Sequence, residues 1–246
     1  MSKVELVVLS LRYSSWSMRP WLALTHGGVP FETRTVTLDD MKVQQAKGGM
    51  VQADLAAAGL GARRSVGSVT GLFPVLWIDG VPIHESLAIC EWAAEQAADV
   101  RLWPEDPVAR AQARSLSLEM VSGFPNIRQQ MSCHVWARVP DFAPSAGAQG
   151  EIARIFELWE SALQRSGGPF LFGDFGIADC MYFPVQTRFR TYGVSLPARL
   201  QEYTAAVLEV PAVQAWAEQA RVAPRIPAYD EYMVSIGGIP DAALPT

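Results

Sequence analysis

The chain has 246 residues, enough to bury the core of one large domain or of two smaller ones. Half of the residues are hydrophobic and 18% are charged, which excludes a disordered chain, and no apolar run reaches the roughly 20 residues of a membrane span. The net charge of −5, with no basic run, argues against nucleic acid as a partner. Because no secretory signal pattern opens the chain, we expect a cytoplasmic protein.

The chain opens with a strand–helix–strand pattern. Residues 4–9 form an apolar, β-branched run that predicts a buried strand. A polar turn over residues 11–17 precedes a predicted helix over residues 18–25, with Gly27 just past its end. Residues 31–38 alternate in character and predict a second strand. A helix between two strands implies that the strands pair in parallel.

A hairpin is predicted around the turn at Asp79, and residues 87–98 are predicted to form a helix over it. The order strand–helix–strand, then hairpin and helix, is that of a thioredoxin-like α/β domain. We expect this domain to cover residues 1–99 and to include an extended segment over residues 39–70.

Four residues of the hairpin region indicate a ligand site. Pro74 stands at the mouth of a strand, where it removes a ladder donor, and we predict a cis Phe73–Pro74 bond that leaves the Phe73 backbone groups unpaired. Glu85 and Ser86 precede a helix, whose N-terminal N–H groups favour a carboxylate. A zwitterionic, peptide-like ligand fits this set: Ser86 would take its carboxylate and Glu85 its ammonium. Glutathione is such a ligand.

The second half of the chain is predicted to be helical. A Pro-containing linker over residues 100–107 marks a domain boundary, and the strand signal disappears after it. We therefore expect an all-α domain over residues 108–246. Its predicted helices cover residues 108–131 with an interruption near Gly123 and Pro125, and residues 151–163, 177–191, 198–208 and 212–221.

Cysteine and histidine are too few and too scattered to indicate a metal site. No CxxC pair and no metal-ligand spacing is present, so we expect no metal and interpret the cysteines as buried, reduced thiols. The residues concerned are Cys90, Cys133, Cys180, His26, His84 and His134.

In both of its predicted halves, the chain resembles the cytosolic glutathione transferases, over nearly its whole length. Residues 13–19, Tyr-Ser-Ser-Trp-Ser-Met-Arg, resemble the Ser-Ser-Cys-Ser-x-Arg signature of the zeta class, with Trp16 in place of the cysteine. Residues 73–76 resemble the cis-proline segment of the family, and Glu85-Ser86 its γ-glutamyl clamp. Residues 176–179, Gly-Ile-Ala-Asp, resemble its capping box, which usually begins with Ser or Thr. Residues 13–17, Tyr-Ser-Ser-Trp-Ser, and the run over residues 183–193, which includes Arg188, are also similar to a bacterial group of these transferases.

The resemblance implies how the site would activate glutathione, whose thiolate is the nucleophile. A hydroxyl at a helix N-terminus favours the thiolate through a hydrogen bond and the helix dipole. We predict Ser14 as this donor, with Ser15 in support. Ser17 is interpreted as a helix N-cap, Tyr13 as a rival donor that packs instead, and Arg19 as one half of a structural ion pair.

The glycine carboxylate of glutathione would be held by the segment over residues 39–70, as the family resemblance implies. Four residues are candidates for this contact, and the sequence does not choose among them: Arg63, Arg64, Lys47 and Gln45. The electrophilic acceptor would lie against the helical domain, in a pocket for which we predict Met120, Phe124, Arg128 and Trp136.

These residues predict a glutathione transferase in which a serine-stabilised thiolate attacks a small electrophile. A zeta-like isomerase, in which glutathione adds to a cis double bond and leaves after rotation, is an alternative, as are a dehalogenase and an ether-cleaving enzyme. A non-catalytic binding protein of the same fold is a further alternative. The resemblance also implies a homodimer, and we expect neither a nucleic-acid nor a membrane partner.

Overall fold

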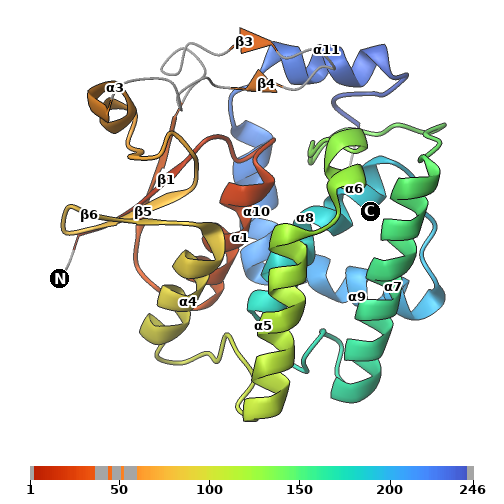
Figure 1. The fold of residues 1–246 in the computed structure, drawn as a ribbon, viewed down its shortest axis with the longest axis horizontal. Helices are drawn as coiled ribbons and strands as arrows, with labels where there is room; N and C mark the ends of the chain where they lie inside the picture. The colour runs from red at the N-terminus through yellow and green to blue at the C-terminus, as the bar shows by residue number, and fades with distance from the viewer. Residues whose placement is uncertain (1–2, 37–43, 46–50, 53–59, 243–246) are drawn as a thin grey trace.

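The computed structural model describes residues 3–36, 44–45, 51–52 and 60–242. Figure 1 shows a small sheet with helices α1 and α4 beside it, followed by a larger half made of helices. No helix of the described residues is long and apolar enough to cross a membrane. The fold is thus the predicted one, a thioredoxin-like sheet followed by an all-helical half.

The sheet has four strands in the order β2-β1-β5-β6. Strand β1 pairs in parallel with β2 and antiparallel with β5, and β5 and β6 form the predicted hairpin. Leu6 of the central strand lies opposite Leu76 and is fully buried. The strands are β1 (Val4–Val8), β2 (Glu32–Thr35), β5 (Val75–Ile78) and β6 (Val81–His84). The predicted parallel pairing is confirmed.

The helix between the first two strands begins earlier than predicted. Helix α1 spans Ser15–His26, whereas the sequence pattern placed its start at Met18. Ser14 is the N-cap, and its side chain accepts a hydrogen bond from the Ser17 backbone N–H. Because several serines in this turn have the chemistry of a cap, the sequence alone does not choose among them.

The helix predicted after the hairpin is present, and the extended segment contains elements for which no prediction was made. Helix α4 (Ser86–Gln96) covers the hairpin. The extended segment contains the two short paired strands β3 (Gln44–Gln45) and β4 (Val51–Gln52), and the helix α3 (Leu60–Ser65).

The helical half contains the predicted helices and one more. Helices α8 and α9 coincide with their predicted ranges, and the interruption near Gly123 and Pro125 separates α5 from α6. Helix α11 was not predicted. The helices are α5 (Pro107–Ser122), α6 (Pro125–Gln130), α7 (Ala146–Ser166), α8 (Ile177–Thr191), α9 (Ala198–Leu208), α10 (Pro211–Val222) and α11 (Pro227–Ser235).

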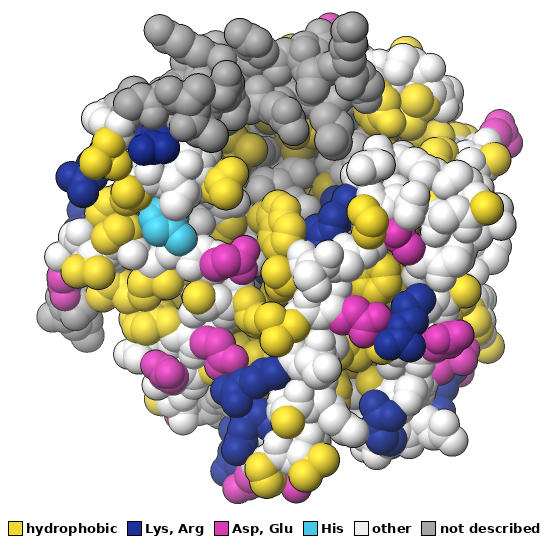
Figure 2. All heavy atoms as spheres, viewed as in Figure 1, with side chains coloured by type: hydrophobic (Ala, Val, Ile, Leu, Met, Phe, Trp, Pro, Cys, Tyr) yellow, Lys and Arg dark blue, Asp and Glu magenta, His cyan; other side chains and the backbone are white. Residues whose placement is uncertain are grey.

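Helix α1 joins the two halves of the molecule. It packs against α4 on one side and against α8 and α10 on the other. The Trp21 ring of α1 meets the Trp216 ring of α10 with centroids 5.3 Å apart, and Met18 and Leu22 are fully buried. Figure 2 shows hydrophobic side chains gathered along the seam between the sheet-containing half and the helices. The start of α1, with its serines, therefore lies where both halves meet.

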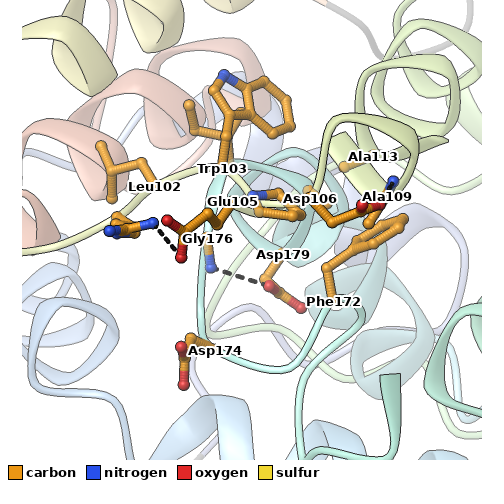
Figure 3. A pocket seen from close by; sticks show the side chains of 14 residues that line it. Leu102, Trp103, Glu105, Asp106, Ala109, Ala113, Phe172, Asp174, Gly176 and Asp179 are labelled. Atoms are coloured by element: carbon orange, nitrogen blue, oxygen red, sulfur yellow. Dashed lines mark hydrogen bonds and ion pairs between the residues drawn. The ribbon is translucent and has the colours of Figure 1, made fainter. Parts of the chain in front are cut away.

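The start of α8 is held by a buried carboxylate. Asp179 accepts hydrogen bonds from the backbone N–H groups of Gly176 at 3.0 Å and Leu171 at 3.2 Å, and from the Tyr203 hydroxyl at 3.0 Å. Figure 3 shows the first of these bonds beside a cavity of about 320 Å³ under the linker. Burial raises the pKa of Asp179 to about 6, although all three donors favour the ionised form. The predicted link from Asp179 back to residue 176 is confirmed.

Glycine at position 176 also has a structural reason. A Cβ atom there would lie 2.6 Å from the Leu102 carbonyl oxygen, which is too close. The same carbonyl accepts the backbone N–H of Ile177 at 2.9 Å. The linker therefore caps α8 with its own backbone and excludes the Ser or Thr that is usual at this position.

Candidate functional site

The serine turn before α1 uses one of its hydroxyl groups as a cap. The Ser14 Oγ accepts from the Ser17 N–H at 3.3 Å and donates to the Ser17 Oγ at 2.9 Å. Ser17 is fully buried, and its Oγ also accepts from the Leu9 N–H at 3.4 Å. The interpretation of Ser17 as the N-cap is therefore wrong, because Ser14 holds that position and Ser17 lies within the first turn.

Ser15 has a different partner. It is buried, and its Oγ accepts a hydrogen bond from the Nη2 of Arg188 at 3.4 Å. Arg188 comes from α8, and its Nε and Nη1 donate to the carbonyl oxygens of Met131 at 2.8 Å and Pro184 at 3.0 Å. The sequence places Arg188 in a run that resembles a bacterial group of transferases but gives it no role, since nothing in its helical pattern separates it from a structural arginine.

Two guanidinium groups lie over the Trp16 ring. The Arg19 Cζ is 4.0 Å from the centroid of its ring, and the Arg128 Cζ is 4.7 Å from it. Such cation–π contacts favour a positive charge at a partly desolvated site. The Trp16 ring thus brings together one arginine from α1 and one from α6.

Arg19 does not form the predicted ion pair. It is fully buried, its Nε donates to the Met181 carbonyl at 3.1 Å, and its two Nη atoms have no hydrogen-bond partner among the described residues. Burial, followed by the charges of Arg128 and Arg188, lowers the pKa of Arg19 to about 9. The prediction is wrong because the side chain turns into the contact between the two halves, where no carboxylate of the described residues lies within ion-pair distance.

The four residues of the predicted ligand site are placed by one hairpin. The Phe73–Pro74 bond is cis, as predicted. Because Val75 lies opposite His84 in the hairpin register, the two residues before Val75 adjoin Glu85 and Ser86. Ser68, which the sequence analysis did not single out, fixes the approach to Phe73: its Oγ donates to the Leu72 carbonyl at 2.8 Å.

Glu85 and Ser86 have features typical of a binding site. The Ser86 hydroxyl is buried at the N-terminus of α4 and has no hydrogen-bond partner among the described residues. Glu85 is exposed and has φ 76° and ψ 126°, a conformation that costs a non-glycine residue energy and is common at functional sites. Among the described residues, its Oε2 accepts only from the Leu87 N–H, at 3.3 Å. The Glu85 carboxylate is open to a ligand, and the neighbouring Ser86 hydroxyl has hydrogen-bonding capacity that the described residues do not use.

The candidates for the glycine carboxylate are only partly placed. Arg63 and Arg64 lie in the last turn of α3, where Arg63 is half-buried and Arg64 is exposed. Lys47 lies outside the described residues, and Gln45 is placed only as part of β3. The contact therefore stays a prediction for all four residues.

Three of the four residues predicted for the acceptor pocket lie around the turn between α5 and α6, and the fourth, Trp136, has different neighbours. Arg128 crosses the turn between α5 and α6, where its side chain donates to the carbonyl oxygens of Met120 and Gly123. Met120 and Phe124 are buried in the main core. Trp136 instead lies under the Arg221 guanidinium, 5.7 Å from the centroid of its ring, and its carbonyl accepts from the Ala242 N–H.

Tyr13 is tied to the unpredicted helix α11. Its hydroxyl donates to the Oδ1 of Asp230 at 3.0 Å and accepts from the Ile226 N–H at 3.2 Å, and its ring stacks on Tyr229 at 4.8 Å. Burial, which opposes ionisation, raises the pKa of Tyr13 to about 12. A tyrosine held in this way packs, as the sequence analysis expected, and its proton is directed at Asp230.

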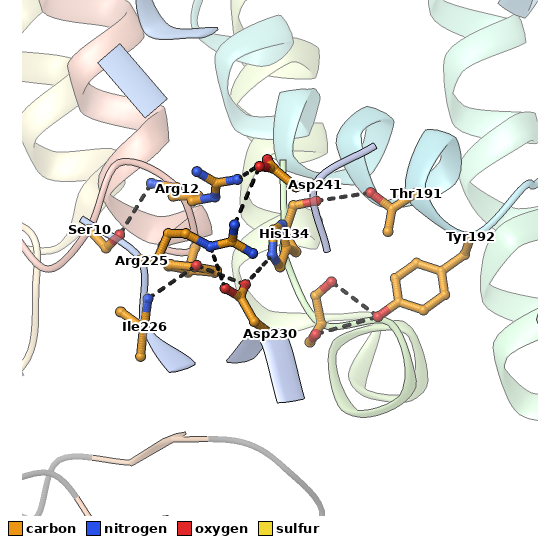
Figure 4. A network of polar contacts seen from close by, with 11 residues as sticks. Ser10, Arg12, His134, Thr191, Tyr192, Arg225, Ile226, Asp230 and Asp241 are labelled. Atoms are coloured by element: carbon orange, nitrogen blue, oxygen red, sulfur yellow. Dashed lines mark hydrogen bonds and ion pairs between the residues drawn. The ribbon is translucent and has the colours of Figure 1, made fainter. Parts of the chain in front are cut away.

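Asp230 is the centre of a polar network that joins the C-terminal segment to the serine turn (Figure 4). It also accepts from the Nε2 of His134 at 2.8 Å and from the Nε of Arg225 at 2.7 Å. Arg12, one residue before Tyr13, pairs with Asp241 at 2.5 Å. Sequence reasoning missed this network because its members are far apart in the chain.

Acid should weaken this network through His134. The His134 ring is buried, and burial lowers the pKa of this histidine. Its Nδ1 has no partner in the part of the chain that the structure describes, so a second proton would leave a buried donor unsatisfied. A histidine pKa lowered by folding adds stability that is full above the unfolded value of about 6.5 and is lost as the pH falls below it. His134→Gln keeps a donor for Asp230 but does not titrate.

Urea unfolding curves between about pH 8 and pH 5 test this expectation for the wild type and His134→Gln. As the pH falls, the free energy of unfolding of the wild type should decrease more than that of His134→Gln. An equal pH dependence of the free energy of unfolding in the two proteins would exclude this role for His134.

Comparisons with known proteins place the chain in a family. It matches the model of the glutathione S-transferase N-terminal domain over residues 13–96, and that of the C-terminal domain over residues 142–219. A probable maleylacetoacetate isomerase of Caenorhabditis elegans is 30% identical over 179 residues, which cover 71% of this chain and 73% of the worm protein. The maleylacetoacetate isomerase of Rattus norvegicus is 33% identical over 124 residues, 50% of this chain and 56% of the rat protein.

Solved structures of the same fold have lower sequence identity. A glutathione transferase homolog from Burkholderia with bound glutathione aligns with a TM-score of 0.62 and 23% identity, over 89% of this chain and 98% of the other. A maleylacetoacetate isomerase from Anaeromyxobacter dehalogenans aligns with a TM-score of 0.61 and 23% identity, over 92% and 96%. Together with the family models and the worm relative, these matches lead to one conclusion: the chain belongs to the glutathione S-transferase family and is a glutathione-dependent enzyme.

Proposed function

We propose that the protein binds glutathione through the Phe73 backbone, Glu85 and Ser86, and that a serine of the turn before α1 stabilises its thiolate for attack on a small electrophile. The observation that carries this proposal is the buried Ser86 hydroxyl, which has no partner at the N-terminus of α4. A buried hydroxyl without a hydrogen bond is costly, so a ligand that supplies one is favoured there. The backbone N–H groups of the same turn favour a carboxylate.

Glu85 supports the same orientation of the ligand. Its exposed carboxylate adjoins Ser86 and can pair with an ammonium group while Ser86 binds the carboxylate on the same carbon. The γ-glutamyl end of glutathione carries both groups. The thiol would then reach toward the start of α1, since α4 and α1 pack side by side.

Glutathione calorimetry tests the clamp. Glu85→Ala is expected to weaken glutathione binding by roughly 2–4 kcal/mol, the size measured when one partner of a desolvated charge pair is removed. Glu95→Ala is a matched control, because Glu95 is exposed on the same helix and should leave the affinity unchanged. Lack of glutathione binding by the wild type, or equal affinity in Glu85→Ala, contradicts the proposal.

A second candidate function is isomerisation of an acidic substrate. Two curated relatives are named maleylacetoacetate isomerase, and the substrate in that name is an anion. The Arg128 guanidinium, which is held against Trp16 near the serine turn, favours an anionic ligand. Incubating the protein and glutathione with candidate electrophiles, and following adducts and isomers separately by mass spectrometry, separates transfer from isomerisation.

We also propose a homodimer with the small domain of one chain against the helices of the other. Exposed apolar side chains on both halves support it: Leu72 is 71% exposed in the sheet-containing half, and Val108 and Leu118 of α5 are 65% and 54% exposed. Light scattering at micromolar concentration is expected to give twice the chain mass of 26.9 kDa. A mass of one chain excludes the dimer.

A further inference from the structure

Three guanidinium groups gather at the start of α1, and none has an ion-pair partner among the described residues. Arg19 and Arg128 lie over the Trp16 ring, and Arg188 reaches the Ser15 Oγ. Buried charges in proteins are ordinarily paired or neutralised, so this cluster is unusual. The positive charge of this arginine cluster favours an anion near Ser15.

Acidic groups near the cluster do not cancel its charge. Glu85, at the start of α4, is exposed to solvent and bonded to a backbone N–H. Glu151 of α7 is bonded to two backbone N–H groups at the start of α6. Cys90 and Tyr182 stay neutral, because burial raises the pKa of each. The field at Ser15 is therefore set by the arginines.

Hydrogen bonding separates the two candidate serines. The Ser14 hydroxyl gives its proton to the Ser17 Oγ and caps α1. The Ser15 Oγ accepts from Arg188, and that leaves the Ser15 proton free to be donated. A thiolate needs a donor, and of these two hydroxyl groups only that of Ser15 has a proton that no described residue accepts.

We propose that Ser15 donates the hydrogen bond to the glutathione thiolate and that Arg188 is the positioning residue that orients its hydroxyl. This inference rests on the proposed function, that the site binds glutathione. On binding, the S–H bond breaks, the proton leaves to solvent and the sulfur keeps the electron pair as a thiolate. The Ser15 O–H and the guanidinium charge behind it then stabilise that anion.

Arg188 has the rigidity that this role needs. Its Nε and Nη1 are held by the carbonyl oxygens of Met131 and Pro184, at 2.8 and 3.0 Å, so the direction of its Nη2 is fixed. The guanidinium is buried, and its charge is poorly screened at the neighbouring hydroxyl. A lysine would keep the charge, but its single ammonium nitrogen lacks the planar fork from which the three guanidinium nitrogens reach three separate acceptors.

The experiment measures the pKa of the bound glutathione thiol from its ultraviolet thiolate absorbance against pH. Ser15→Ala is expected to raise this pKa by about one unit, and Arg188→Lys by a part of that. In the double variant, Arg188→Lys should add little to the shift, because Arg188 acts through Ser15. Arg190→Lys, two residues along α8 and bonded to the Val135 carbonyl, is the control and should leave the thiol pKa unchanged.

Two outcomes overturn the proposal. In one, Ser15→Ala leaves the thiol pKa where it was. In the other, Arg188→Lys shifts it equally with and without the Ser15 hydroxyl. Arg188→Gln, which keeps a side-chain donor without the charge, replaces Arg188→Lys if that variant does not fold. Failure of the wild type to bind glutathione would contradict the proposed function itself, whereas intact binding with an unmoved thiol pKa rejects only this inference.

Discussion

Ser15→Ala is expected to lower turnover by roughly ten- to a thousandfold at neutral pH, the loss that follows removal of one preorganised donor to a developing anion. The electrophile is one that forms a glutathione adduct in the screen described above. The KM for glutathione should change little, because the proposed contacts of glutathione with Glu85 and Ser86 remain. Steady-state kinetics with glutathione and the electrophile varied in turn separates kcat from KM.

Ser14→Ala is the companion variant. Loss of its cap on α1 should cost about 1 kcal/mol of stability, with a smaller effect on turnover than that of Ser15→Ala. If Ser14→Ala instead removes turnover and Ser15→Ala spares it, the sequence-based choice of Ser14 as thiolate donor holds and the assignment to Ser15 fails.

Asp179→Ala is expected to lower the free energy of unfolding by about 3–5 kcal/mol, because three buried donors lose their acceptor at once and each unsatisfied group costs about 1–3 kcal/mol. The donors are the N–H groups of Leu171 and Gly176 and the Tyr203 hydroxyl. Urea unfolding at about pH 8, above the pKa of this carboxyl, measures the loss. Asp174→Ala is the control, since Asp174 is an exposed carboxylate close by in the chain.

Gly176→Ser tests whether the N-cap position of α8 can accommodate a side chain. A serine here would supply the hydroxyl that is usual at an N-cap, yet its Cβ would meet the Leu102 carbonyl at 2.6 Å. We therefore expect a loss of about 1–3 kcal/mol, as for other overpacked positions. A gain in stability would show that the linker can move aside.

Local patterns were sufficient for much of the fold. The helices at residues 177–191 and 198–208, the hairpin at Asp79 and the cis bond before Pro74 were all predicted from short-range signals. Hydrophobic periodicity and turn chemistry depend on residues that are close in the chain, so they can be recognised without knowledge of the tertiary structure. Helix α11 escaped prediction because its face packs on Tyr13, more than 200 residues earlier in the chain.

For the candidate ligand site too, the sequence was sufficient for some features and the tertiary structure was needed for others. The sequence by itself determined the family resemblance and the positions of Phe73, Glu85 and Ser86, because these residues lie in one hairpin and the turn after it. Only the tertiary structure decided the partners of the serines: Arg188 reaches Ser15 from 173 residues away. It also left Arg19 without a carboxylate and set Leu102 against Gly176. These contacts join elements distant in sequence, and their distances and burial exist only once the two halves have packed.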